Sequence, residues 1–150
     1  DLGKYARGLK IGQSVAINGV CLSATKISRN KCVFEMIDET IKKTDLGNVN
    51  AGSIVNIERS LKVGDRLEGH FVLGHIDGVA IITKIDQKTK NRSAIQMTVD
   101  LGKYASGLKI GQSVAINGVC LSATKISRNK CVFEMIDEVH YKRAKALLEI

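Results

Sequence analysis

The sequence contains no tryptophan, and aromatic residues make up only 4% of its 150 positions. A core must therefore rely on Val, Ile, Leu and Ala, which suits a small β-rich fold. No apolar run approaches the roughly 20 residues that a membrane-spanning helix requires, and no signal-peptide pattern opens the chain. Because 44% of the residues are hydrophobic, we expect a cytoplasmic protein with one ordinary domain or two very small ones.

The sequence also lacks clusters of charges of one sign, although its formal net charge is +8. The basic residues alternate with acids such as Asp38, Glu39 and Asp45. No aromatic platform accompanies them, as the binding of single-stranded nucleic acid would need. The charge favours only nonspecific contacts with polyanions, so specific nucleic-acid binding is not expected.

The cysteines follow neither a zinc-binding pattern nor a disulfide pattern. There are four of them, and they are two residues counted twice: Cys21, Cys32, Cys120 and Cys131. If Arg29-Asn30 forms a hairpin tip, Cys32 lies opposite Ile27 and Cys21 lies opposite Asp38. The two thiols of one copy are then too far apart to bridge, so we expect reduced cysteines and no metal site.

A long repeat organises the chain. Residues 1–39 and 100–138 are identical except that Arg7 is replaced by Ser106. Natural duplications drift much further apart than this. The near-perfect copy therefore indicates a recombinant origin or a very recent duplication, and we favour the recombinant origin.

Within each copy, one apolar strand face comprises Val15, Ile17, Val20, Leu22 and Ala24. These residues share a face only if the pleat shifts by one residue at Asn18-Gly19, which predicts a β-bulge there. The opposite face then carries a row of small polar groups, Cys21, Ser23 and Thr25. Such a row either lines a pocket or forms a solvated strand face, and the pattern alone leaves both open.

Period-two alternation continues through most of the chain. Further strands are predicted over residues 32–38, 53–58, 79–85 and 94–99, with a short helix over residues 41–46 that ends at Gly47. The tail, residues 139–150, has apolar residues at helical spacing, which predicts a short amphipathic helix. A helix of this length must dock on the barrel or on another subunit to be stable.

Three segments together resemble the riboflavin synthase family: GQSVAINGVCLSATKI, FEMIDETIKKTDLG and SIVNIERSLKVGDRLEGHFVLGHIDG. The resemblance runs from about residue 1 to residue 85. It implies a six-stranded Greek-key barrel. With the short helices and the C-terminal amphipathic helix predicted from the sequence pattern, the expected fold class is all-β with minor α content. The family converts two molecules of 6,7-dimethyl-8-ribityllumazine into riboflavin and a pyrimidinedione without a metal or organic cofactor. Lumazine or riboflavin is thus the implied ligand.

The resemblance also implies site residues. It assigns catalytic positions to Ser14, Cys21 and His75, the last because a histidine with a near-neutral pKa can move a proton. Positions that contact the ring or the ribityl chain are implied at Ser23, Ile37, Glu39, Thr40, Gly74, Ile76, Ser113, Cys120 and Ser122. A turn histidine without chemistry is the alternative interpretation of His75.

Departures from the family pattern shape the expected organisation. The family's Met-Phe-Thr-Gly-Ile opening strand is absent, Val139 stands where the first copy has Thr40, and the elements of residues 40–58 are not repeated. We therefore predict one complete barrel plus a spare hairpin, with segments 1–71, 72–138 and 139–150. Two copies would compete for one place, so a homo-oligomer is expected, and domain swapping is one route to it.

Three functions remain open from the sequence. The first is a riboflavin synthase-like enzyme, which needs two facing ring sites. The second is a module that binds lumazine or riboflavin without turnover. The third alternative is an engineered barrel with no catalytic activity.

Overall fold

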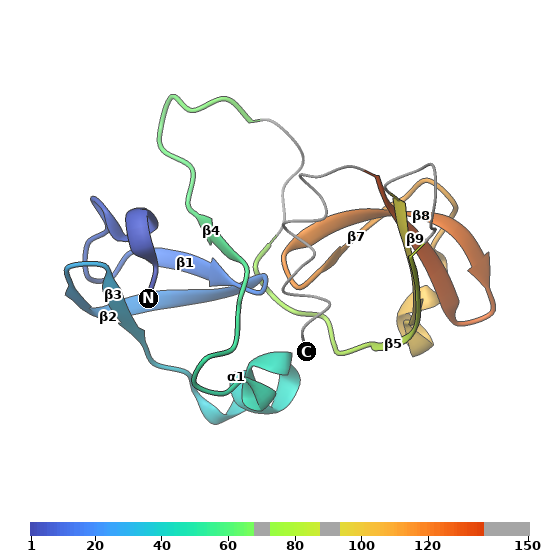
Figure 1. Ribbon diagram of the computed structural model, residues 1–150, viewed down its shortest axis with the longest axis horizontal. Coiled ribbons are helices and arrows are strands. Elements are labelled where there is room, and N and C mark those ends of the chain that lie inside the picture. The colour runs from blue at the N-terminus through green and yellow to red at the C-terminus, as the bar shows by residue number, and fades with distance from the viewer. Residues whose placement is uncertain (68–72, 88–93, 137–150) are drawn as a thin grey trace.

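A computed structural model of the chain describes residues 1–67, 73–87 and 94–136 (Figure 1). The first half contains η1 (Gly3–Ala6), β1 (Ser14–Ile17), β2 (Val20–Ser28), β3 (Lys31–Phe34), α1 (Asp38–Lys43), η2 (Asp45–Asn48) and β4 (Ile57–Arg59). The second half contains β5 (Ile81–Gln87), β6 (Ala94–Asp100), η3 (Gly102–Ala105), β7 (Ser113–Ile116), β8 (Val119–Ser127) and β9 (Lys130–Ile136).

These strands form two antiparallel sheets that lie side by side (Figure 1). The first has the order β3-β2-β1-β4, and the second has the order β5-β6-β9-β8-β7. Each copy of the repeat thus occupies a sheet of its own, β1 to β3 in one and β7 to β9 in the other.

Each sheet buries its own apolar cluster, because alternate residues of every strand point to the same face. The first cluster contains Leu2, Ala6, Leu9, Val15, Ile17, Val20, Leu22, Ala24 and Leu46. The second contains Ile95, Met97, Val99, Leu101, Ala105, Val119, Leu121, Ala123, Cys131, Phe133 and Met135. As the composition predicted, Val, Ile, Leu and Ala supply most of both cores.

The bulge predicted at Asn18-Gly19 is wrong. These two residues are instead the tip of the β1–β2 hairpin, in which Ile17 pairs with Val20. Both tip residues have positive φ, 47° and 81°, as the tight two-residue turn of a twisted hairpin requires. A turn of this length returns Val20 to the face of Ile17, which explains the apolar pattern without a pleat shift. The irregularity of this sheet lies between Ala24 and Lys26.

The β2–β3 hairpin turns at Arg29-Asn30, as predicted. Ile27 pairs with Cys32, and Ser28 pairs with Lys31 at the turn. The irregularity near Ala24, however, means that the expected pairing of Cys21 with Asp38 does not form, because β3 ends at Phe34. None of the four cysteines, all of which lie in the described residues, forms a disulfide bond.

The fold class is confirmed at the coarse level: the chain is mostly β with a few short helices. In the described part, the strands form two open sheets and not a closed six-stranded barrel.

The expected helix over residues 41–46 appears as α1 followed by η2, starting three residues earlier than predicted. The predicted tail helix, 139–150, lies outside the described residues, and within them no helix is long and apolar enough to cross a membrane.

The two sheets meet at their equivalent hairpin tips. An added Cβ on Gly19 would lie 2.9 Å from the backbone nitrogen of Gly118, so the turns are in backbone contact. Asn56 bridges the halves: its backbone N–H donates to Oδ1 of Asn18 over 2.8 Å, and its side-chain amide donates to the carbonyl of Asn117 over 2.9 Å. The repeated Asn-Gly turn therefore serves both as a hairpin tip and as the junction.

Candidate functional site

The β1–β2 hairpin presents its small polar row on the outer face of the first sheet. Ser14 lies opposite Ser23, and Ala16 lies opposite Cys21. Cys21 and Ser23 are exposed, while the residues that alternate with them, Val20, Leu22 and Ala24, are buried. One thiol and two hydroxyl groups are thus available to a ligand on a rigid strand pair.

The segment around Gly74 crosses this row. The backbone N–H of Cys21 donates to the carbonyl of Gly74 over 3.2 Å. Gly74 has a φ of +69°, and an added Cβ would lie 2.9 Å from Cβ of Cys21. A glycine is therefore required both by the backbone conformation and by the close approach. We call residues 73–77 the crossing segment.

The crossing segment carries two further predicted site residues. His75 is exposed, and its ring Nδ1 lies 3.2 Å from the carbonyl oxygen of Leu73. Ile76 is partly buried against the first core. The structure thus brings Ser14, Cys21, Ser23 and Gly74 to one surface, with the neighbouring His75 held by a backbone contact of the same segment.

The second copy repeats the polar row with the same register. Ser113 pairs with Ser122, their hydroxyl oxygens lie 3.4 Å apart, and Ala115 pairs with Cys120. Cys120 is exposed, as is its counterpart Cys21. The chain therefore carries two polar rows of identical composition, one on each sheet.

The other predicted contacts lie on α1 or at its start. Ile37 is the N-terminal cap and is 69% exposed. Glu39 is exposed and pairs with Lys43, whose hydrogen bond and charge lower the pKa of that carboxyl. The carbonyl of Thr40 accepts hydrogen bonds from the backbone and hydroxyl of Thr44. Among the described residues, no hydrogen bond links α1 to the polar row.

Sequence reasoning missed the polar junction between the halves. Asn18 is 2% exposed, and its side-chain amide donates to Oδ2 of Asp45 over 3.4 Å. Burial raises the pKa of the Asp45 carboxyl, while hydrogen bonds from Asn18 and Asn117 oppose that rise. The sequence signal for this junction is the Asn-Gly dipeptide that occurs in each copy of the repeat, which the alternation pattern interprets as a bulge.

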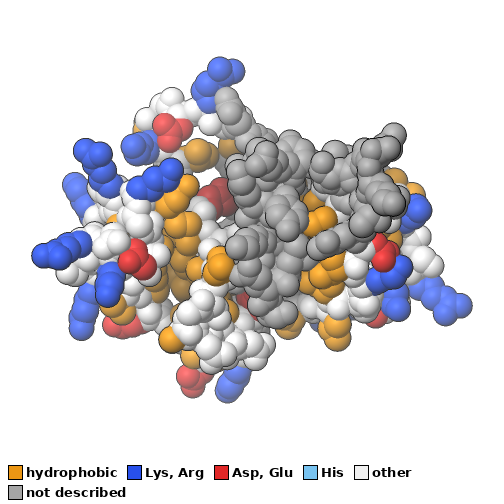
Figure 2. Space-filling model, viewed as in Figure 1, with side chains coloured by type: hydrophobic (Ala, Val, Ile, Leu, Met, Phe, Trp, Pro, Cys, Tyr) orange, Lys and Arg blue, Asp and Glu red, His pale blue; other side chains and the backbone are white. Residues whose placement is uncertain are grey.

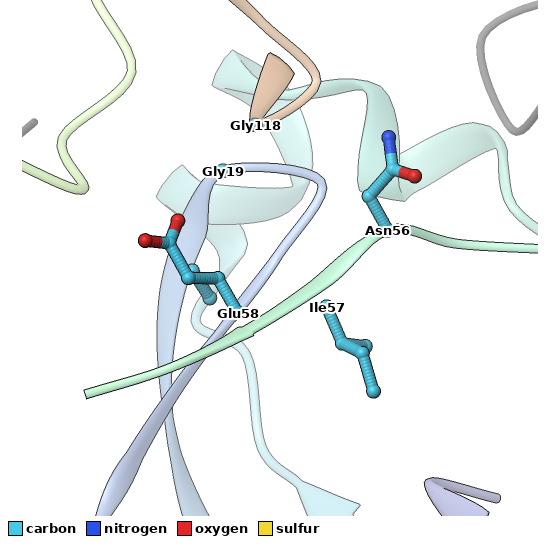
Figure 3. Close-up of a pocket in the computed structure, with 6 residues that line it drawn as sticks. Gly19, Asn56, Ile57, Glu58 and Gly118 are labelled. Atoms are coloured by element: carbon cyan, nitrogen blue, oxygen red, sulfur yellow. The ribbon is translucent and has the colours of Figure 1, made fainter. Parts of the chain in front are cut away.

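A small cavity sits at this junction, lined by Ala16, Gly19, Asn56, Ile57, Glu58 and Gly118 (Figure 3). Its volume is about 30 Å³, which suits one water molecule and not a ring system. In the part of the chain that the structure describes, no cluster of His, Cys, Asp and Glu is arranged to hold a metal ion.

Charge does not mark a separate binding surface on the visible face. Lys and Arg side chains are spread around its periphery and are not gathered into one patch (Figure 2). For the described residues on this face, the distribution agrees with the scattered basic residues of the sequence.

Comparison with known proteins gives one family. The sequence matches the lumazine binding domain over residues 4–60 and again over residues 73–143. It is 32% identical to riboflavin synthase of Bacillus subtilis over 133 residues, which span 89% of this chain and 61% of that protein. Riboflavin synthase of Buchnera aphidicola is 39% identical over 132 residues, 88% of this chain and 63% of that protein. The chain thus spans about three-fifths of the length of these relatives.

Solved structures agree. The crystal structure of LumP complexed with 6,7-dimethyl-8-(1'-D-ribityl) lumazine superposes with a TM-score of 0.74 at 25% identity, covering 88% of this chain and 69% of that one. LumP complexed with riboflavin gives a TM-score of 0.76 at 23% identity, with 88% and 70% coverage, and supports the fold.

Proposed function

Because this chain belongs to the lumazine-binding domain family, we propose that it binds 6,7-dimethyl-8-ribityllumazine or riboflavin on the polar rows of its two sheets. The observation that carries the proposal is the exposed face of the β1–β2 hairpin, where Cys21 and Ser23 stand beside the crossing segment. In the first half, Ser14, Cys21 and Ser23 are the proposed contacts, with Gly74 and His75 at the edge of the ligand.

The proposed face matches the chemistry of such ligands. A ribityl chain offers several hydroxyl groups, and serine hydroxyls can both donate to and accept from them. The ring carries carbonyl and nitrogen acceptors, which suit hydroxyl and thiol donors. The same donors recur at Ser113, Cys120 and Ser122, so we propose a second site on the second sheet. Neither site needs a metal or an organic cofactor.

The two proposed sites are unequal. In the first half, the described crossing segment lies over Cys21, and α1 supplies Glu39 and Thr40 beyond the sheet. In the second copy, Val139 replaces the threonine. We expect the first site to bind ligand more tightly, because it retains a hydroxyl that the second lacks. A six-stranded Greek-key barrel is the finer form of this proposal, and the fold likeness to LumP supports it.

Lumazine dismutation is the second candidate function, favoured by the riboflavin synthase relatives. Two rings must face each other for the four-carbon transfer, so positioning carries most of the rate. A solvent-exposed His75 beside the first polar row is the proposed proton carrier.

The test titrates the chain into ribityllumazine, following ligand fluorescence and riboflavin formation together. Ser23→Ala is the informative variant, and Ser122→Ala is its matched control in the identical sequence of the second copy. Loss of one neutral hydrogen bond costs about 0.5–1.5 kcal/mol, or roughly a twofold to tenfold rise in Kd. Ser23→Ala should weaken the tighter phase and Ser122→Ala the weaker one. No fluorescence change with the parent chain would refute binding, and absence of riboflavin would refute turnover alone.

A further inference from the structure

The crossing segment lies between the two sheets and is held by both halves of the molecule (Figure 1). Near its start, the carbonyl of Gly74 accepts the N–H of Cys21 from the first sheet. At its end, the carbonyl of Asp77 accepts the hydroxyl of Tyr104 over 2.6 Å. Tyr104 belongs to η3 of the second half. The segment is therefore fixed at two points, by residues from two different copies of the repeat.

Tyr104 reaches the crossing segment from a fixed base in the second half. Its neighbours Leu101 and Ala105 are 5% and 8% exposed and belong to the second core. The backbone N–H of Leu101 also donates to the carbonyl of Asn129 over 2.9 Å, which ties η3 to the turn between β8 and β9. The position of the Tyr104 side chain is thus set by the packing of the second core.

Gly78, directly after the crossing segment, shows how closely this tyrosine packs. An added Cβ on Gly78 would overlap the Tyr104 hydroxyl oxygen and would lie 2.5 Å from two ring carbons. The φ of Gly78 lies outside the left-handed region, so the backbone conformation does not require glycine there. A position without a side chain is instead needed because the Tyr104 hydroxyl must reach the carbonyl of Asp77.

The exposed His75 stands between the two anchor points of the segment. We propose that Tyr104 is a positioning residue for the first ligand site: by holding Asp77, its hydroxyl keeps His75 beside the polar row of the β1–β2 hairpin. This inference rests on the proposed function, because that row and His75 are the proposed ligand contacts. It adds that the first site depends on a side chain of the second half.

Tyr5 provides a matched control, because residues 3–6 and 102–105 both read GKYA. Among the described residues, the hydroxyl of Tyr5 makes no hydrogen bond, whereas that of Tyr104 holds Asp77. Tyr5→Phe therefore removes the same atom from the same local sequence without removing a hydrogen bond from the crossing segment.

The first experiment measures hydrogen exchange of the Cys21 amide by NMR in the absence of ligand. This amide should exchange roughly twofold to tenfold faster in Tyr104→Phe than in Tyr5→Phe, because loss of one neutral hydrogen bond shifts a local equilibrium by that factor. The Ala24 amide, which bonds within the hairpin, should exchange equally in both variants. Gly78→Ala, which pushes the tyrosine ring away from the segment, should speed exchange of the Cys21 amide in the same way.

The second experiment separates positioning from a general effect on the fold. Fluorescence titration gives the Kd of 6,7-dimethyl-8-ribityllumazine for Tyr104→Phe, for His75→Ala and for the double variant. Tyr104→Phe should raise the Kd of the tighter phase roughly twofold to tenfold, and Tyr5→Phe should leave it unchanged. In the His75→Ala background, Tyr104→Phe should have no further effect, because it acts through His75. A merely structural contribution would act equally in both backgrounds.

Equal exchange of the Cys21 amide in Tyr104→Phe and Tyr5→Phe would overturn the inference, whether or not the chain binds a ligand. An unchanged Kd in Tyr104→Phe would overturn it too, as would an equal rise in Kd with and without His75. Absence of binding by the parent chain would refute the proposed function and the positioning role with it, whereas the exchange experiment reports on the Tyr104 contact alone. Both phenylalanine variants should stay folded by circular dichroism, because they retain the aromatic rings.

Discussion

Replacement of Gly74 by alanine should loosen the crossing segment by a predictable amount. Two effects combine: a residue with a side chain at a φ of +69° is strained, and its Cβ would lie 2.9 Å from Cβ of Cys21. The matched control is Gly64→Ala, where φ is +94° and no atom lies within 4 Å of the added Cβ. Left-handed strain costs each variant about 1–2 kcal/mol, so the difference between them isolates the contact with Cys21.

The expected difference is set by the hydrogen bond that the contact would break. The N–H of Cys21 donates to the carbonyl of Gly74 over 3.2 Å, and such a bond contributes about 1 kcal/mol net. That is about fivefold in the equilibrium between closed and open segment. We therefore expect the Cys21 amide to exchange with deuterium about five times faster in Gly74→Ala than in Gly64→Ala, with a similar fivefold loss of ribityllumazine affinity.

Amide exchange measured by NMR gives a reference within the same hairpin. The N–H of Ala24 donates to the carbonyl of Gln13 over 3.0 Å and does not involve the crossing segment. Its exchange should be the same in both variants. Equal exchange of the Cys21 amide in the two variants would refute the close packing of Gly74 on the hairpin. A matching change at Ala24 would mean that the whole sheet had been destabilised.

Three further predictions concern the junction and the two cores. Burial raises the pKa of Asp45 above its ordinary value of 3.8, so folding stability should rise as pH falls through the raised pKa and level off below 3.8. Asp45→Asn should abolish that rise in urea titrations between pH 7 and pH 3. Gly19→Ala should lower the melting temperature more than Gly12→Ala, because both have strained φ but only Gly19 meets the opposite hairpin tip. Phe133→Ala should cost about 3–5 kcal/mol by chemical denaturation, and Phe34→Ala distinctly less, since Phe133 is fully buried and Phe34 is only partly buried; equal costs would contradict this difference in burial.

Local sequence features predicted the elements well where turn chemistry and alternation decide the structure. The Arg29-Asn30 tip gave the pairing of Ile27 with Cys32, and the alternation of Val20, Leu22 and Ala24 gave the buried face. The error at Asn18-Gly19 came from counting the pleat straight through a dipeptide that is itself the strongest short hairpin signal. An assignment that started from the turn would have found the correct register.

Other features could not be predicted from local sequence at all. The identical residues of β3 and β9 differ in length and burial because β6 is present beside only one of them. The junction depends on Asn56, which lies far from both hairpin tips in the sequence. For the site, spacing placed Cys21 and Ser23 on one face, and the family resemblance added Ser14. Their meeting with Gly74 required the crossing segment to be seen in three dimensions.

Ligand binding by the polar row of the β1–β2 hairpin is tested by a fluorescence titration of 6,7-dimethyl-8-ribityllumazine with the parent chain and with a Ser14→Ala, Ser23→Ala double variant. We expect saturable binding by the parent chain and loss of its tighter phase in the double variant. The double variant should keep the parent melting temperature, because both hydroxyls lie on the outer face. Unchanged affinity in a folded double variant would mean that the polar row does not bind the ligand.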